Sequence, residues 1–245
     1  MKIAIVSGAS SGIGKSIVKH LDLLSLDEIW LIARNEARLN QLKAELNTTT
    51  RCFVLDLSQN SSFEVIKNEF VQANCKVEYL VLSAGVGYNG AFDSLSFDEI
   101  QNTININCSA LVMLTTIVSP FIIEMGNVIC IASGAGFLPQ PYFNVYAASK
   151  AFAISFSRAL REELRQKKVR VTAVCPGPVD TEFFSGLKDV KEYKKKYLIS
   201  ADRVSKGAIK AVHKNKAIYS PTLSIKLVHL VSKIIPTSLL LKFYK

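Results

Sequence analysis

The chain has 245 residues, of which 49% are hydrophobic, and no repeat or Pro/Gly-rich linker divides it. These features are enough for one domain with a large core, and they exclude a disordered or repetitive protein. The net charge of +10 arises in the last quarter, where the segment from Gly186 onward holds 14 basic and three acidic residues. Such asymmetry predicts an anionic partner: a membrane surface, an acidic substrate or a nucleic acid.

Short apolar runs alternate with longer runs of helical periodicity along the chain. This order predicts βαβ units, and the strands are apolar throughout, as in a parallel sheet covered by helices on both faces. We therefore predict an α/β fold, a single doubly wound Rossmann-type domain over 1–245, with ligands at the carboxyl ends of the strands. The predicted strands are 3–6, 28–34, 51–57, 77–85, 126–133 and 169–177. The predicted helices are 15–25, 36–47, 61–73, 96–122 and 146–167, of which 96–122 is either one long helix or two. A helix and a short strand are expected within 200–221, and a further helix over 223–236.

A glycine-rich turn, "SGASSGIG", follows the first predicted strand and opens the first helix. Glycines let backbone approach a ligand closely, and a helix N-terminus favours phosphate. The spacing of Gly8, Gly12 and Gly14 is G-x-x-x-G-x-G, so a tight strand–helix turn is the alternative to a dinucleotide site. The second strand ends without an acidic residue at Ala33 and with Arg34 next to it, which favours NADP(H) over NAD(H).

Tyr146 and Lys150 are four residues apart, so they share one face of a predicted helix. A nearby ammonium favours the phenolate, so we expect Lys150 to lower the pKa of Tyr146. Ser133 ends the preceding strand, where its hydroxyl could orient a carbonyl oxygen. A chance pair on a surface helix is the alternative interpretation.

The motifs taken together resemble the short-chain dehydrogenases/reductases from about Lys2 to Thr181. The matching segments are "SGASSGIG", "LDLS", "SAG", "NINCSA", the Ser133–Tyr146–Lys150 set and "CPGPVDT". The resemblance implies four catalytic residues, Asn107, Ser133, Tyr146 and Lys150. It implies cofactor binding by Gly8, Ser10, Ser11, Gly12, Ile13, Gly14, Arg34, Asp56, Leu57, Ser83, Ala84, Gly85, Tyr146, Lys150, Pro176, Gly177, Val179 and Thr181.

The resemblance also implies a role for each catalytic residue. Tyr146 would exchange a proton with the substrate oxygen, Ser133 would bind that oxygen, and Lys150 would lower the pKa of the tyrosine and bind the nicotinamide ribose. Asn107 would hold a water in a proton relay. Asn105 competes for the asparagine role, but the family spacing selects Asn107.

Two positions depart from the family pattern. Ser7 replaces the usual threonine and keeps its hydroxyl. Ser83 replaces the asparagine of the family's Asn-Ala-Gly segment, and its shorter side chain puts the support of the sheet there in question.

The resemblance places a variable substrate lid at about 182–200, before an amphipathic tail at about 223–245. Five lid residues could line an apolar cleft: Phe183, Phe184, Leu187, Tyr193 and Tyr197. The lysines 188, 191 and 194–196 form either a solvated helix face or a contact with an anionic group, such as the phosphate of an acyl carrier. The tail either packs on its own domain or a second subunit, or contacts an anionic membrane.

We predict from these features an NADP(H)-dependent oxidoreductase acting on a lipophilic ketone or 3-oxoacyl-type compound, in a homodimer or homotetramer. An NAD-dependent alcohol dehydrogenase of the same family and a weakly catalytic NADP(H) sensor are the alternatives. The five cysteines lack metal or redox spacing, so we expect no metal and a reducing compartment. We recognise no targeting segment and no run of about 18 uncharged apolar residues, so we expect a cytoplasmic location. Association with a membrane is the alternative. No base-reading motif accompanies the lysines, so nucleic acid is not expected to bind.

Overall fold

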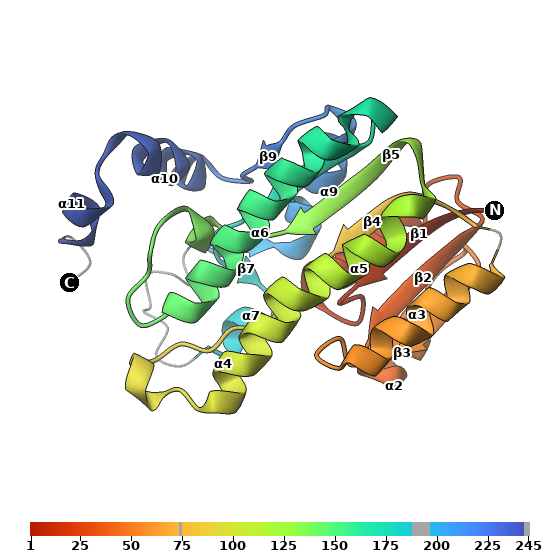
Figure 1. Ribbon diagram of the computed structural model, residues 1–245, viewed down its shortest axis with the longest axis horizontal. Helices are drawn as coiled ribbons and strands as arrows, with labels where there is room; N and C mark the ends of the chain where they lie inside the picture. The colour runs from red at the N-terminus through yellow and green to blue at the C-terminus, as the bar shows by residue number, and fades with distance from the viewer. Residues whose placement is uncertain (74, 188–196, 243–245) are drawn as a thin grey trace.

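The computed structural model describes residues 1–73, 75–187 and 197–242. A seven-stranded sheet, in which every strand pairs in parallel with its neighbours, forms the centre of the molecule in the order β3-β2-β1-β4-β5-β6-β9. Its strands are β1 (Lys2–Ser7), β2 (Glu28–Ala33), β3 (Thr50–Val54), β4 (Lys76–Leu82), β5 (Ile122–Ile131), β6 (Arg170–Val174) and β9 (Ile218–Tyr219). The predicted doubly wound α/β fold is confirmed (Figure 1).

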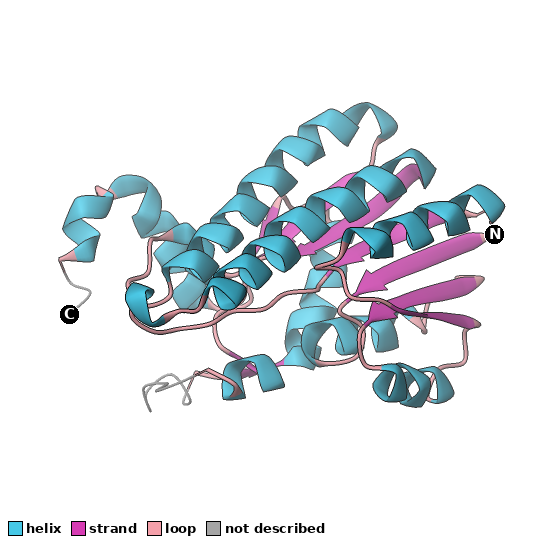
Figure 2. Cartoon of the chain, turned by 60° about the horizontal axis from the view of Figure 1, so that its bottom comes forward, coloured by secondary structure: helices cyan, strands magenta, loops and turns pink. Residues whose placement is uncertain are grey.

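Helices cover both faces of the sheet (Figure 2). Each face has its own apolar cluster, because successive residues of a strand point to opposite sides, as Ile3 and Ala4 do. The helices of one face are α3 (Asn60–Gln72), α4 (Phe97–Ile104), α5 (Ala110–Val118) and α6 (Asn144–Glu163). Those of the other are α1 (Gly12–Leu21), α2 (Glu36–Ala44) and α9 (Ala201–His213). The remaining short elements are β7 (Val179–Asp180), α7 (Glu182–Ser185), β8 (Ile199–Ser200), α10 (Leu223–Ile234) and α11 (Thr237–Leu241).

Several strands end earlier than their apolar runs predicted. β3 ends at Val54, β4 at Leu82 and β6 at Val174, each three residues before the predicted end. After β3 the backbone turns at Asp56, and after β6 Pro176 lacks a backbone N–H. Both features prevent further strand pairing. The extra residues therefore form loops at the carboxyl edge of the sheet, where ligands of this fold bind.

The predicted helix over 96–122 is one continuous helix from Phe97 to Phe121, with a π-helical segment at Asn105–Ser109. Contrary to the sequence-based expectation, its length and apolar composition are sufficient to cross a membrane, and in the described part of the chain it is the only such helix. Its inward side packs Ile106, Leu111 and Leu114 into the core against the sheet. This packing is typical of a core helix.

Candidate functional site

The glycine-rich turn between β1 and α1 brings backbone segments into close contact. Gly8 has a φ of +67°, and a Cβ there would lie 2.8 Å from the Cα of Ala84. A Cβ on Gly14 would overlap the carbonyl oxygen of Gly8. Helix α1 begins at Gly12, three residues earlier than predicted, so Gly12, Ile13 and Gly14 form its first turn.

The first turn of α1 has free anion-binding capacity. Ser11 stands at its N-cap without a capping hydrogen bond from its side chain to the described residues, and the turn carries no acidic side chain. Backbone N–H groups at such a helix start bind phosphate well. A Cβ on Gly12 would lie 3.3 Å from the Cγ2 atom of Thr181, so the turn also borders the loop that follows β6. The cradle therefore fits the diphosphate of a dinucleotide, with Ser10 and Ser11 beside it.

The Ser7 hydroxyl ties β1 to the end of β4. It accepts hydrogen bonds from the backbone N–H groups of Ser83 at 3.1 Å and Ala84 at 3.3 Å, and donates to the carbonyl oxygen of Val81 at 3.3 Å. The Ser83 hydroxyl faces Gly14, since a Cβ added to that glycine would lie 3.1 Å from it. Ser7 thus supports the Ser83–Gly85 segment. The sequence had put this support in question, because Ser83 replaces the family's asparagine.

The residues predicted to contact the adenosine half lie at the ends of β2 and β3. Arg34 is exposed directly after β2, and Asn35 caps α2 by accepting from the backbone N–H of Arg38 at 2.9 Å. Asp56 forms a turn in which its carboxylate accepts from the backbone N–H of Ser58 at 2.9 Å. Leu57 is buried beside the core. Arg34 is accordingly free to meet solvent or a ligand at this edge.

Asn107 is buried in the π-helical segment and is held on both sides of its amide. Its Nδ2 donates to the carbonyl oxygen of Val86 at 2.8 Å and to the Ser149 hydroxyl at 2.9 Å, while its Oδ1 accepts from the backbone N–H of Val86 at 2.9 Å. Asn105, the competitor, instead accepts from Gln101 on the outer side of the helix. The structure therefore brings Asn107, not Asn105, to the site, as π-helical segments often do for functional residues.

Tyr146 lies near the start of α6 in an aromatic environment. Its ring stacks on Phe143 with centroids 4.3 Å apart, and Phe183 lies 5.4 Å away. Burial raises the pKa of Tyr146 to about 12, although a hydrogen bond from the Ser133 hydroxyl favours the phenolate. The pKa of Tyr146 is therefore raised rather than lowered in this structure, because desolvation outweighs the Ser133 hydrogen bond, and a lowering effect of Lys150 stays a prediction.

Lys150 is buried one turn further along α6. Its Nζ donates to the carbonyl oxygen of Ile131 at 3.0 Å and lies 5.7 Å from the centroid of the Tyr146 ring. Burial lowers the pKa of Lys150. Gly85 permits this placement, since a Cβ there would lie 3.2 Å from Nζ and 3.4 Å from the Oδ1 of Asn107.

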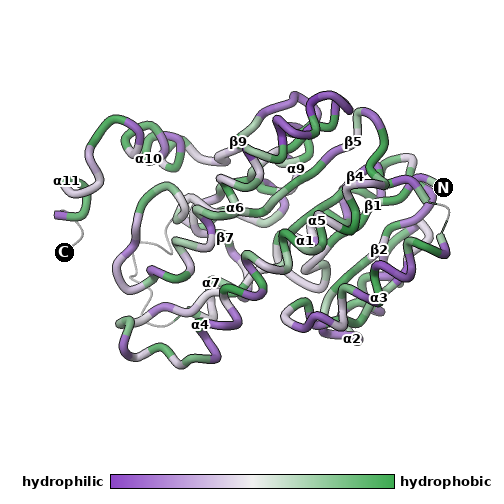
Figure 3. Tube along the Cα trace, viewed as in Figure 1, coloured by the Kyte–Doolittle hydropathy of each residue, from purple (hydrophilic) through white to green (hydrophobic). Residues whose placement is uncertain are grey.

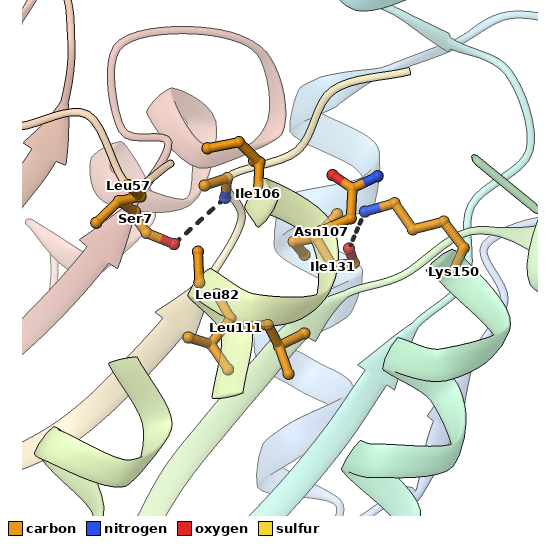
Figure 4. A pocket seen from close by; sticks show the side chains of 10 residues that line it. Ser7, Leu57, Leu82, Ile106, Asn107, Leu111, Ile131 and Lys150 are labelled. Atoms are coloured by element: carbon orange, nitrogen blue, oxygen red, sulfur yellow. Dashed lines mark hydrogen bonds between the residues drawn. The ribbon is translucent and has the colours of Figure 1, made fainter. Parts of the chain in front are cut away.

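A small cavity joins Lys150 to the cofactor side of the sheet (Figure 4). Three polar side chains, those of Ser7, Asn107 and Lys150, reach it from β1, the π-helical segment and α6. The rest of its lining is apolar: Leu57, Leu82, Ala84, Ile106, Ala110, Leu111 and Ile131. Four of the predicted site residues, Leu57, Ala84, Asn107 and Lys150, therefore line one cavity at the carboxyl edge of the sheet.

The loop after β6 passes beside Ser133. The carbonyl oxygen of Pro176 accepts from the backbone N–H of Gly134 at 2.8 Å, next to Ser133. Gly177 continues this loop, and Val179 is buried in β7, which pairs with β8 in a short second sheet that the sequence did not predict. The loop thus borders the residue after Ser133 through Pro176 and the glycine turn through Thr181.

Several residues of the site had no clear signal in the sequence. Ser149 holds Asn107, and Phe143 supports Tyr146. Ile225, from α10, would lie 3.0 Å from a Cβ on Gly134 and 3.1 Å from one on Gly177. Ser149 precedes Lys150 directly, and this was the one local signal that it belongs to the site. The contacts of Ile225 join residues far apart in the chain, so no local signal could have predicted them.

The lid is described only in part. Phe183 and Phe184 lie in α7, and Phe183 contacts Tyr146 as expected for a residue lining the cleft. Leu187 is half-buried and Tyr197 exposed. Tyr193 and the lysines 188, 191 and 194–196 lie outside the described residues.

Comparison with known proteins gives consistent matches. A family model described as short chain dehydrogenase matches residues 2–192. The very-long-chain 3-oxoacyl-CoA reductase of Mus musculus is 32% identical over 219 residues, which cover 85% of this chain and 68% of that protein.

Solved structures share the fold. A short-chain dehydrogenase from Sphingobium yanoikuyae in complex with NADPH has a TM-score of 0.81 at 22% identity, covering 100% of this chain and 97% of that one. A serine dehydrogenase complexed with NADP+ has a TM-score of 0.77 at 30% identity, covering 89% and 94%. Other neighbours are complexed with NADH. The chain therefore belongs to the short-chain dehydrogenase family, and it is an oxidoreductase of CH–OH and C=O groups that uses a nicotinamide cofactor.

Proposed function

We propose that the protein is an NADP(H)-dependent reductase of a lipophilic ketone or 3-oxoacyl-type compound. The observation that carries this proposal is the position of Tyr146: it is buried, hydrogen-bonded to Ser133, and enclosed by Phe143 and Phe183. A protonated phenol held beside a second hydroxyl in this way suits donation to a carbonyl oxygen during reduction.

The proposed chemistry divides between the cofactor and the side chains. When bound, the reduced nicotinamide supplies the hydride for the carbonyl carbon. Tyr146 donates the proton to the oxygen, and the Ser133 hydroxyl binds that oxygen as negative charge develops. Lys150, whose Nζ lies 5.7 Å from the centroid of the Tyr146 ring, is proposed to bind the ribose and to favour the phenolate. Asn107, fixed by Val86 and Ser149, is proposed to hold the water that returns a proton toward Lys150.

The preference for NADP(H) rests on Arg34. A guanidinium at the end of β2 matches a 2′-phosphate, whereas the NAD pattern has a carboxylate one residue earlier, where this chain has Ala33. We propose that the adenosine lies between Arg34 and the Asp56–Leu57 turn.

The substrate class is inferred from the surroundings of Tyr146. Phe143 and Phe183 flank its ring, so the space in front of the phenol is bounded by apolar side chains. The name of the mouse relative, very-long-chain 3-oxoacyl-CoA reductase, agrees with an apolar chain beside a ketone.

We propose a homodimer or homotetramer formed through α5 and α6. Met113 and Phe152 are large apolar residues exposed on these neighbouring helices, and burial of such residues is the usual basis of stable association. A cytoplasmic location is proposed because all five cysteines are free.

The direct test is consumption of NADPH and, separately, NADH with a panel of ketones and 3-oxoacyl-CoA thioesters of graded chain length. We expect turnover that favours NADPH and rises with chain length. A Tyr146→Phe variant serves as the matched control and should bind NADPH without turnover. Tight NADPH binding with no turnover on any carbonyl would favour the sensor alternative, and equal use of NADH would remove the role given to Arg34.

A further inference from the structure

The outward side of α10 carries a stripe of large aliphatic residues. Leu223, Leu227, Leu230 and Ile234 recur at intervals of three or four residues, so they lie along one side of the helix. They are 80%, 61%, 56% and 70% exposed, and among the residues that the structure describes nothing covers them. A contiguous apolar surface of this kind marks a site of interaction.

The inward side of the same helix fixes its orientation. Ile225 packs beside Gly134 and Gly177 in the two loops that border Ser133. The His229 ring stacks on Phe137 with centroids 4.2 Å apart and planes 8° from parallel. Because α10 is anchored on this side, the aliphatic stripe must face away from the domain.

The charges around the stripe are of one sign. Lys226 and Lys233 are exposed beside it on the same helix, and Lys242 follows α11. The sequence from 203 to 245 holds nine basic residues and no acidic one. Leu239 and Leu241 are exposed on α11, so the apolar surface continues past Pro236.

The charge pattern decides between two occupants. A second copy of α10 packed on this stripe would bring lysines together without carboxylates from residues 203–245 to pair with them. One helix stripe is also small beside the roughly 800 Å² per partner that specific interfaces bury. An anionic bilayer offers both components, because its acyl boundary accepts leucines and its headgroups accept lysines.

We infer that the outward stripe of α10 binds the surface of an anionic lipid bilayer. The helix lies in the interface plane, with the leucines in the acyl boundary and the lysines at the headgroups. Figure 3 shows α10 and α11 at the end of the molecule away from the N-terminus, alternating apolar and polar segments. Since Ile225 holds α10 against the loops beside Ser133, this docking places the catalytic end of the molecule toward the bilayer, whichever substrate is reduced.

The test measures co-sedimentation of the full chain with vesicles of phosphatidylcholine alone and with 30 mol% phosphatidylglycerol (about the anionic content of many membranes). We expect binding to the anionic vesicles that weakens as salt rises. Leu227→Asp/Leu230→Asp should reduce the partition coefficient at least about tenfold. Lys226→Glu/Lys233→Glu should reduce it at least about 25-fold, since each lysine near the surface contributes about fivefold.

Matched controls separate the stripe from general charge and hydrophobicity. Lys206→Glu/Lys210→Glu makes the same charge change on α9. Leu23→Asp/Val71→Asp alters apolar residues that are even more exposed, just after α1 and near the end of α3. Both controls should bind vesicles as the wild type does, and melting curves confirm that every variant folds. Absence of binding to anionic vesicles at low salt overturns the inference, as does full binding by both α10 variants. A dimer that dissociates only in Leu227→Asp/Leu230→Asp assigns the stripe to a second copy instead. None of these readouts depends on turnover.

Discussion

Removal of the Tyr146 hydroxyl is the sharpest test of the proposed chemistry. In Tyr146→Phe the ring keeps its stacking on Phe143, so we expect NADPH binding to be retained. Turnover should fall by about 10²- to 10⁴-fold, the usual contribution of a general acid. NADPH oxidation and a fluorescence titration of NADPH binding measure the two effects separately.

The same variant should change how stability depends on pH. Burial raises the pKa of Tyr146 to about 12, whereas the unfolded tyrosine ionises near 10. The unfolded state therefore loses its proton first, so this contribution to stability is complete below about pH 10 and is lost as pH rises to about 12. At pH 11 the wild type should have lost about 1.4 kcal/mol from this residue. Phenylalanine cannot ionise, so Tyr146→Phe should lack that loss in urea unfolding compared at pH 8 and pH 11.

Tyr79 provides a matched control at a distance from the site. Burial also raises the pKa of Tyr79 to about 12, and its hydroxyl is 2.6 Å from the Nε2 of His213. Tyr79→Phe should therefore reduce the alkaline loss of stability in the same way while keeping turnover. Full turnover in Tyr146→Phe would refute the assignment of the acid. If the free energy of unfolding changed with pH in the same way in Tyr146→Phe and in the wild type, the raised pKa of a buried, neutral Tyr146 would be refuted.

Three further substitutions test the cofactor half and its support. Arg34→Ala should raise the KM for NADPH about 10- to 100-fold, because it removes a charge-assisted bond, and should leave NADH kinetics unchanged. Arg38→Ala, four residues further along the chain, is the control. An equal effect of Arg34→Ala on both cofactors would contradict the 2′-phosphate role. Gly14→Ala should abolish NADPH binding in calorimetry, because its Cβ would overlap the carbonyl oxygen of Gly8; tight binding would exclude the proposed cradle. Asn107→Ala leaves the part-buried backbone N–H of Val86 without its acceptor, so we expect a loss of about 1–3 kcal/mol in urea unfolding together with reduced turnover. Unchanged stability would mean that these bonds do not hold the site.

The glycine turn was predictable because its signals are local. The turn from Gly8 to Gly14 must be glycine-rich to pass the backbone of Ala84, and this requirement is visible as spacing in the sequence. Alternation of apolar runs predicted the parallel sheet, since a sheet buried on both faces needs continuous apolar strands. The ends of β3, β4 and β6 were placed too late, because apolar residues such as Leu57 continue past the last paired residue into the loops.

The ionisation state of Tyr146 was not predictable from its spacing to Lys150. The i,i+4 relation places both residues on one side of α6, but it does not say how deeply they are buried. In the structure Lys150 donates to Ile131, and desolvation dominates both groups, raising one pKa and lowering the other. Long-range packing, which brings Phe183 and Phe143 onto the tyrosine, decides this balance.

The position of α10 shows why the substrate half of the site resists prediction. Its amphipathic pattern was visible, yet packing on the domain and contact with a membrane both fitted the sequence. The structure shows that the two uses fall on different sides of one helix: Ile225 meets the loops beside Ser133, while Leu227 and Leu230 face outward. A substitution at Ile225 should therefore act on the reaction, and one at Leu227 on vesicle binding. The two sides of α10 work independently if Ile225→Ala changes kcat or KM but not vesicle binding, while Leu227→Asp changes vesicle binding but not kcat or KM. If each variant changes both the kinetics and vesicle binding, docking and catalysis are coupled through this helix.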